Sequence, residues 1–371
     1  MNILKRISPP GWAMILMVGV TVFISLLGRP AAAPAPAATA TLPAIGDLAA
    51  RRAALGATLT AEPANAAANF QLGLLLALDQ PDEAARLLRI AAEQDPAYQA
   101  ASQSLRSTLV QASTLDNPAY AAILIGQALA AQGEWAAAAA AFERSAAHNP
   151  DYAEAWAFLG EARQQLGGEG YPELQKALQL DPASLAVNLF HAAYWRRQGD
   201  PAQAVVFLET AAALQPDNPA IRADLGETLA ELGDVQAALE HYVIVTDLAP
   251  DSAASWQLLA EFCIRNDVQV EAFGLPAARQ ALLMVGEDAY SLTLMARAFT
   301  LLGDTLNAEK FFDRAITADP EYADAYLHLG LYLVGRGQME PARAALEQAS
   351  QLGAGTPIGA EADAALTRYF P

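Results

Sequence analysis

Apolar side chains recur from about residue 65 to residue 356 at positions i, i+3, i+4 and i+7, the spacing of one helix face. These stretches come in pairs, and the pairs repeat with a common period. Pro182, Pro216 and Pro250 lie 34 residues apart, and Gly286 and Pro320 are separated by the same interval. A fixed period of this length predicts stacked copies of one two-helix unit and not a single globular core.

The positions inside each period also repeat. The opening Trp156-x-x-Leu159-Gly160 returns in later periods, and a second half also recurs in which Ala is followed four positions on by Phe, Tyr or Leu and then by a closing proline. The further copies are Leu225-Gly226, Trp256-x-x-Leu259-Ala260 and Tyr326-x-x-Leu329-Gly330, then Ala138/Phe142/Pro150, Ala204/Leu208/Pro216, Ala238/Tyr242/Pro250 and Ala308/Phe312/Pro320. Turn glycines separate the halves at Gly133, Gly167, Gly199, Gly233, Gly303 and Gly337. In these residues the chain resembles the tetratricopeptide repeat (TPR) family.

The resemblance implies an all-α fold, a right-handed TPR α-solenoid of helix-turn-helix repeats spanning residues 45–371. Small residues at the eighth and twentieth positions of a unit would let its two helix backbones approach closely. The turn glycine supplies a left-handed conformation after the first helix, and the closing proline cannot continue the second. About eight repeats are expected, at 66–98, 119–152, 153–184, 185–218, 219–252, 253–288, 289–322 and 323–356.

Three places depart from the period. The third unit is two residues short around Gly167–Gly170, and the sixth is two residues longer around Phe273–Pro276. Residues 99–115 predict one extra helix without a partner, which could break the superhelix into two blocks. Residues 45–58 and 358–369 predict capping helices at the two ends, where terminal repeats need a more polar outer face.

The N-terminus predicts a membrane anchor. Residues 1–10 carry Lys5 and Arg6, residues 11–28 are uncharged and apolar, and residues 29–44 form a Pro/Ala-rich linker. Eighteen helical residues span about 27 Å, close to the hydrocarbon thickness. The positive charges favour a cytoplasmic N-terminus, with single-pass insertion and the repeats outside the cytoplasm. The alternative is a cleaved signal peptide with Ala31–Ala33 as its cleavage site, which would give a secreted or periplasmic product.

Composition narrows the partner class. The chain of 371 residues has a net charge of −19, and all but three of its 22 basic residues lie beyond residue 44, against 41 acidic ones. Nucleic acid is therefore not expected as a partner, because phosphate binding needs a basic stripe. The single cysteine, Cys263, excludes a disulfide framework and is expected to be a small buried residue.

No pattern in the chain indicates an enzyme. Its four histidines have no partners at ligand spacing, and it contains no G-x-S-x-G, P-loop or dinucleotide fingerprint. No cofactor and no metal are therefore expected. His191 stands where the repeat pattern has leucine and is expected to be a core or half-buried side chain.

The resemblance also implies a candidate site, because TPR proteins use positions two, five, nine and twelve of each first helix to line the concave face. Mapped onto this chain, those positions predict a peptide-binding groove at Gln127, Glu161, Leu189, Glu227, Gln257, Glu261, Arg297, Leu327, Leu331 and Val334. Three glutamates, at 161, 227 and 261, suggest an acidic stripe with an apolar end beyond it. A basic and apolar peptide would suit that groove. The family's carboxylate clamp is not matched, because Phe, Leu, Glu and Ala occupy its positions.

These observations predict a non-enzymatic scaffold that binds a protein or an extended peptide in its concave groove. A membrane-anchored layout resembles bacterial TPR proteins of cell-envelope assembly, secretion or cytochrome maturation. Two alternatives stay open: a self-associating structural protein of the envelope, and an accessory subunit of an envelope enzyme complex. The sequence does not determine the oligomeric state or the partner.

Overall fold

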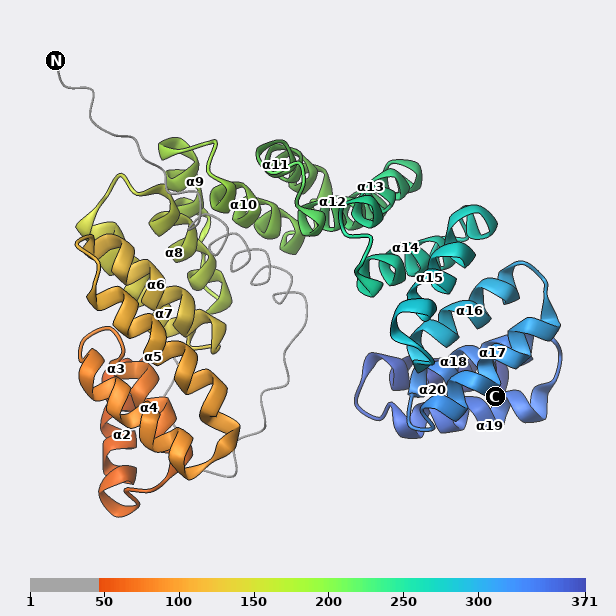
Figure 1. The fold of residues 1–371 in the computed structure, drawn as a ribbon, viewed down its shortest axis with the longest axis horizontal. Helices are drawn as coiled ribbons and strands as arrows, with labels where there is room; N and C mark the ends of the chain where they lie inside the picture. Colours follow the sequence, from red (N-terminus) through yellow and green to blue (C-terminus); the bar gives the residue numbers. More distant parts are fainter. Residues whose placement is uncertain (1–46) are drawn as a thin grey trace. The chain divides into compact units, whose positions relative to one another are not determined.

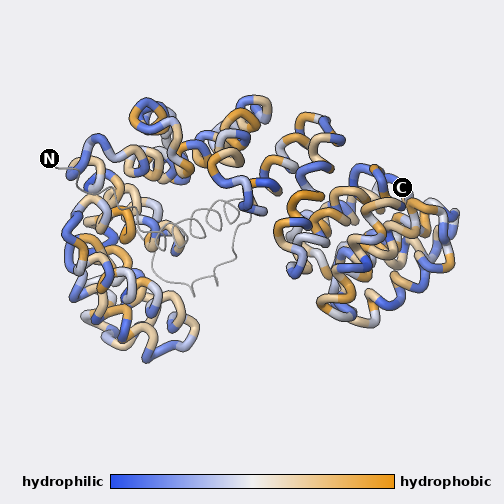
Figure 2. The backbone as a smooth tube through the Cα atoms, turned by 45° about the horizontal axis from the view of Figure 1, so that its top comes forward, coloured by the Kyte–Doolittle hydropathy of each residue, from blue (hydrophilic) through white to orange (hydrophobic). Residues whose placement is uncertain are grey.

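Helices make up the fold of residues 47–371, the part of the chain that the computed structural model describes, and no strand occurs among them (Figure 1). The apolar span predicted at residues 11–28 and the linker at 29–44 lie outside these residues. Along the tube of Figure 2, hydrophobic and hydrophilic positions alternate within each helix, as amphipathic helices packed on one side require. Among the helices of residues 47–371, none combines the length and apolar character needed to cross a bilayer.

Successive helices pair, the first of each pair preceding a short turn and the second following it. The pairs are α3 (Ala66–Leu76) with α4 (Pro81–Gln94), α6 (Pro118–Ala131) with α7 (Trp135–His148), α8 (Ala153–Gln165) with α9 (Tyr171–Leu180), and α10 (Leu185–Arg197) with α11 (Pro201–Leu214). They continue as α12 (Pro219–Glu231) with α13 (Val235–Leu248), α14 (Ala253–Arg265) with α15 (Leu275–Val285), α16 (Ala289–Leu301) with α17 (Thr305–Ala318), and α18 (Ala323–Gly335) with α19 (Met339–Leu352). The expected all-α solenoid of helix-turn-helix repeats is confirmed.

Small residues set the distance between paired helices, as the sequence predicted. A Cβ atom at Gly126 would lie 2.4 Å from the Phe142 ring, and one at Gly226 would lie 3.1 Å from the Tyr242 ring. The turn glycines follow the predicted conformation too. Gly133, for example, has a φ of +75°, and the N–H of Glu134 then donates to the carbonyl of Leu129, which closes the first helix.

A recurring hydrogen bond joins five of the first helices, α3, α8, α10, α12 and α14, to the turn before each. The fourth residue of the unit donates to the carbonyl of the proline six residues earlier. Trp156 Nε1 lies 2.8 Å from the Pro150 oxygen, and Trp256 Nε1 lies 2.8 Å from the Pro250 oxygen. Asn69, Asn188 and Arg222 make the same contact to Pro63, Pro182 and Pro216. The proline therefore ends one helix pair and also supplies the acceptor that orients the next.

The helix at 99–115 takes a different role from the one expected. It is present as α5 (Gln99–Ser113), after a short 3₁₀ turn at Pro96–Tyr98. It packs against both α4 and α6, and Leu105 and Leu109 are buried. The expectation that it could break the superhelix was wrong, because its apolar face bridges the two flanking pairs and so replaces a missing partner.

The insertion in the sixth unit forms a π-helix at Val270–Gly274 that leads directly into α15. Asp267 stands where other units have the turn glycine, and both Asp267 and Gln269 have a φ of +48°. Left-handed backbone is unfavourable in non-glycine residues, so this turn is held by its surroundings. Val270 is buried and packs with Cys263 and Leu294 in one apolar cluster.

Contacts divide the chain into two compact units, one ending at Leu214 and the other covering Gln215–Pro371. In the second unit the first helices contact one another in succession, α14 with α16 and α16 with α18. In the first unit α8 contacts both α6 and α10 in the same way. First helices therefore form the inner layer of each unit, and side chains on their open faces are the ones that a groove would use.

Both predicted capping helices are present. At the C-terminal end, α20 (Pro357–Tyr369) packs on α18 and α19, with Thr356 as its N-cap. At the other end, α2 (Leu48–Ala61) packs on α3. Polar contacts also hold α2: Arg51 forms a buried pair of hydrogen bonds with Glu134, at 3.0 and 2.8 Å.

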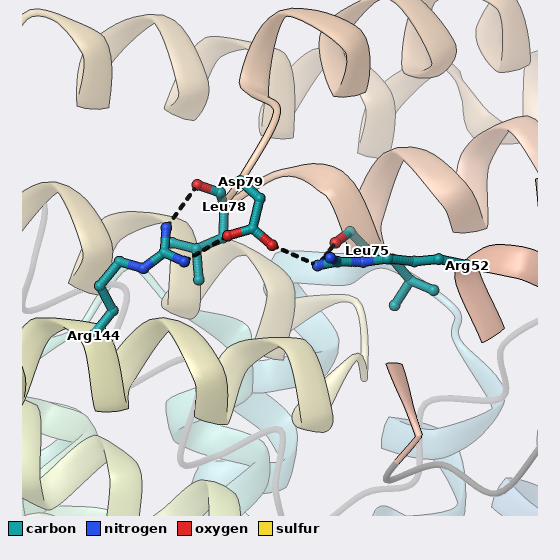
Figure 3. Close-up of polar contacts among 5 residues, drawn as sticks. All are labelled: Arg52, Leu75, Leu78, Asp79 and Arg144. Carbon is teal, nitrogen blue, oxygen red and sulfur yellow. Dashed lines mark hydrogen bonds and ion pairs between the residues drawn. The ribbon is translucent and has the colours of Figure 1, made fainter. Parts of the chain in front are cut away.

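Asp79, in the turn between α3 and α4, connects α2 to the second helix pair (Figure 3). Its carboxylate accepts from Arg52 of α2 at 2.9 Å and from Arg144 of α7 at 2.5 Å. The same arginines donate to the carbonyls of Leu75 and Leu78. The hydrogen bonds from the two arginines to the Asp79 carboxylate, above all the one from Arg144, lower the pKa of Asp79. Partial burial acts in the opposite direction but is outweighed.

Candidate functional site

A pocket of about 510 Å³ opens on the inner layer of the second unit, between the C-terminal halves of α16 and α18. Arginines stand around it: Arg265 ends α14, Arg297 lies on α16, and Arg336 follows α18. The remaining lining is mostly apolar, namely Ile264, Thr300, Leu301, Thr305, Phe312, His328, Leu331, Tyr332 and Gly335. Among the described residues, no carboxylate lines this pocket.

A second pocket of about 560 Å³ adjoins the first and shares Arg265, Arg297 and His328 with it. It extends toward the turn between α19 and α20, where Gly353, Thr356 and Ile358 form its far wall. Acidic side chains do line this part, at Glu261, Asp324 and Glu361. The two pockets together make a groove whose charge changes along its length. We call the first the arginine pocket and the second the mixed pocket.

Two of the acidic residues at the junction already have basic partners. Arg297 donates to Glu261 at 2.7 Å, and the His328 Nε2 atom lies 3.5 Å from the Asp324 carboxylate. Burial would raise the pKa of Asp324, but the hydrogen bond from His328 and the positive charge of Arg297 outweigh it, and the pKa is lowered. Asp324 is therefore charged at neutral pH.

The Arg297–Glu261 and His328–Asp324 pairs do not neutralise the other two arginines of the arginine pocket. Within residues 47–371, neither Arg265 nor Arg336 forms an ion pair, and both side chains are exposed. Tyr332, in the same wall, donates its hydroxyl to Glu309 at 3.0 Å. Among the described residues, the pocket thus presents two guanidinium groups that form no ion pair, beside an apolar floor.

Family models match three stretches of the chain. One tetratricopeptide repeat model matches residues 196–262, and another matches residues 123–184 and 293–357, together just over half of the chain. The chain belongs to the tetratricopeptide repeat family. No curated protein matches this TPR chain.

Solved TPR structures show similar arrangements over part of the chain. PilW, titled a widely conserved type IV pilus biogenesis factor, is 17% identical, covers 57% of this chain and 97% of its own, and has a TM-score of 0.48. PilF of Pseudomonas aeruginosa is 18% identical over 58% of this chain and 98% of its own, with a TM-score of 0.41. MamA from Desulfovibrio magneticus RS-1 is 21% identical over 45% and 94%, with a TM-score of 0.39. At these values the similarity carries no information about function.

The acidic stripe expected at position nine of the TPR unit is not present as free charge. Glu161 is buried, and both its oxygens accept from Arg197, 36 residues further along, while Gln165 donates at 2.8 Å. Glu261 pairs with Arg297, again 36 residues on. The physical reason is the stacking of repeats, which places an arginine of the next first helix over each of these carboxylates. Glu227 is exposed.

The other predicted groove residues lie in different environments. Arg297 and Leu331 do line the arginine pocket, whereas Leu189 and Leu327 are buried in the cores and are not part of a surface. Val334 is half-buried against α19 and the chain end, and Gln127 is half-buried on α6. Gln257 donates to the Ser291 hydroxyl at 3.0 Å and so joins two repeats. Of the predicted apolar end, only Leu331 is positioned to touch a ligand.

The structure adds Arg265, Arg336 and His328, which position-based reasoning missed. Arg265 and Arg336 lie one and two positions beyond the last position that was mapped, at the ends of first helices. Arg197 shares the thirteenth position with Arg265, which is the signal that could have drawn attention to it. What sequence could not show is that Arg197 forms an ion pair with Glu161, while Arg265 forms none with any residue of 47–371.

Two other expectations concern buried side chains, and both are confirmed. Burial raises the pKa of the Cys263 thiol to about 12, so this residue is an inert member of the α14 core. His191 is buried, its Nε2 lies 2.9 Å from the Leu174 carbonyl, and burial lowers its pKa. Within residues 47–371, no group of three or more His, Cys, Asp or Glu could hold a metal ion.

Proposed function

We propose that this TPR protein is a non-enzymatic scaffold that holds an extended segment of a partner protein in the groove of its second unit. The supporting observation is the pair of adjoining pockets on the inner faces of α14, α16 and α18. First helices of a solenoid form its inner layer, and repeat proteins use such extended surfaces for binding. The groove combines an apolar floor with a few directed polar groups, as ligand sites usually do.

A photocrosslinking amino acid at Leu301 would test this proposal. Leu301 lines the arginine pocket and is 43% exposed, whereas Leu283, on the second helix α15, is 74% exposed and lines neither pocket. In native membranes we expect the Leu301 probe to give a discrete crosslinked partner, identified by mass spectrometry. The Leu283 probe, as the matched control, should not give that partner. The same product from both positions, or from Leu283 alone, would show that the groove is not the binding surface.

We further propose that residues 11–28 anchor the protein in the cell membrane, with the repeats outside the cytoplasm. The apolar run follows Lys5 and Arg6 and precedes a Pro/Ala-rich spacer, a layout suited to envelope assembly, secretion or cytochrome maturation. Protease added to spheroplasts should then degrade the repeats while the full-length chain stays with the membrane. A soluble product that starts near Pro34 would contradict the anchor and support the cleaved signal instead.

A further inference from the structure

The arginine pocket places three arginines, Arg265, Arg297 and Arg336, around one apolar hollow of this acidic protein. We infer that it takes an acidic peptide segment, in which a carboxylate stands next to a large apolar side chain. The inference rests on the proposed function, since it names the chemistry of the ligand in the same groove. It replaces the basic ligand that the sequence suggested.

Charge is the first argument. Arg265 and Arg336 have no ion pair in the described part of the chain, and Arg297 is fixed by Glu261 at the junction with the mixed pocket. A guanidinium binds a carboxylate through two parallel, charge-assisted hydrogen bonds, which a neutral water molecule does not reproduce. Two unpaired guanidiniums at one pocket therefore favour a ligand that brings negative charge.

The apolar lining is the second argument. Leu301 and Leu331 line the pocket with the arginines; Leu301 is 43% exposed and Leu331 is half-buried, whereas Phe312 lies buried beneath them. Covering this surface requires an apolar side chain from the ligand. A free inorganic anion or a short polar acid would leave it uncovered. The ligand should thus carry both groups within a few residues of each other.

The net charge excludes the main competing anion. Nucleic acid would also pair with arginine, but the chain carries a net charge of −19, and a long polyanion is repelled by such a surface. A peptide with two or three carboxylates faces less repulsion over its short length. Screening also limits that repulsion to about 8–10 Å at physiological salt. A short acidic segment is therefore the occupant that the observations favour.

Selection from a library of displayed peptides tests the inference without knowledge of the natural partner. The full-length chain in detergent is the bait, and the double variant Arg265→Gln/Arg336→Gln is the comparison. We expect peptides with Asp or Glu beside Leu, Phe or Tyr to be enriched on the wild type. Fluorescence anisotropy of one enriched peptide should show that its affinity falls about tenfold or more in the double variant and depends less on salt.

Arg279→Gln is the matched control, because Arg279 is an exposed arginine of α15 that lines neither pocket. It should leave the affinity unchanged. Circular dichroism should show all three proteins equally folded, since the changed side chains make no ion pair within residues 47–371. Synthesis of the peptide with a free and with an amidated C-terminus then distinguishes a side-chain carboxylate from a terminal one as the group that is bound.

Enrichment of Lys- or Arg-rich peptides, no charge preference, no enrichment at all, or equal affinity for the double variant would each overturn the inference. Its failure can be separated from failure of the proposed function. A specific crosslink from Leu301 without any acidic preference would contradict only the ligand chemistry. If neither the Leu301 crosslink nor the acidic preference is found, the groove is not the binding surface.

Discussion

A methyl group at Gly126 would lie 2.4 Å from the Phe142 ring, and one at Gly160 would lie 2.7 Å from the Gly170 carbonyl oxygen. We therefore expect Gly126→Ala and Gly160→Ala each to lower the free energy of unfolding by about 1–3 kcal/mol through overpacking. Gly56 on α2 is the control, because no atom lies within 4 Å of its added Cβ. Gly56→Ala should raise stability by about 0.5–1 kcal/mol. Urea titrations measure all three, and unchanged midpoints for the first two would contradict the helix contacts.

The buried pair of Glu161 with Arg197 makes a second residue-scale prediction. Only 1% of Glu161 is exposed, so Arg197→Gln would leave a carboxylate buried without its partner. We expect a loss of about 3 kcal/mol, because an uncompensated buried charge keeps its desolvation cost. Adding Glu161→Gln to Arg197→Gln should recover part of this lost stability. Thermal unfolding of the two single variants, the double variant and the wild type gives the double-mutant cycle.

The Arg89–Glu93 pair on α4 is the control for that cycle. Both its side chains are at least half exposed, at 50% and 55%. Arg89→Gln should therefore cost less than about 1 kcal/mol. Equal losses at both sites would mean that Glu161 is not desolvated as the structure shows.

Residue identity alone predicted the structural roles of the glycines and prolines. It wrongly assigned Glu161 and Glu261 to a stripe of free charge in the groove. Glycine and proline act through the local geometry of the backbone, so their effects follow from their positions in the sequence. Glu161 and Glu261 depend on an arginine 36 residues away, and only the stacking of repeats brings the two together. The same lack of information made Leu189 and Leu327 seem to be groove residues, whereas they are buried.

At the scale of elements, the attachment of α2 depends on the charge of Asp79. Its pKa is lowered by the hydrogen bonds from Arg144 and Arg52, to below the ordinary value of 3.8. The folded chain therefore keeps this carboxylate charged where the unfolded chain already binds a proton. The stability it contributes is complete above about pH 5, shrinks as pH falls through 3.8, and is lost below the lowered pKa.

Asp79→Asn should therefore raise the hydrogen-exchange rate of α2 amides at neutral pH and flatten the acid side of the stability curve. Glu83→Gln is a matched control, because the pKa of Glu83 is also lowered, by a hydrogen bond from Arg86 on the same helix. It should alter acid stability and leave α2 exchange unchanged. Equal α2 exchange in Asp79→Asn and the wild type would show that Arg51 and apolar packing suffice.

Element positions were largely predictable from the sequence because amphipathic periodicity and helix ends are local properties. The insertion near Gly274 was visible as two extra residues, but not as a π-helix with left-handed residues at 267 and 269. The packing of α5 was also not predictable, because the repeat pattern contains no second helix to pair with it. Its neighbours α4 and α6 cover its apolar face in the structure.

For the whole molecule, stacking means that each repeat draws its stability mainly from its neighbours. Gly126→Ala perturbs the first compact unit, and Gly330→Ala perturbs the second, because an added Cβ at Gly330 would lie 2.6 Å from Leu346. We expect the first change to raise amide exchange in α6 to α8 and to leave α16 to α20 unaffected. The second should do the reverse, raising exchange in α16 to α20 and sparing α3 to α7.

Hydrogen-exchange mass spectrometry of the two variants, side by side, makes this a reciprocal test. If the units respond separately, the arginine pocket keeps its shape when the first unit is weakened, and the affinity for an acidic peptide should not change in Gly126→Ala. Gly330→Ala should weaken the same peptide, because Leu331 and Tyr332, which line the pocket, follow the altered residue directly on α18. Uniform exchange across both units in either variant would instead show that the solenoid unfolds as one cooperative body, and the peptide affinity would then fall in both.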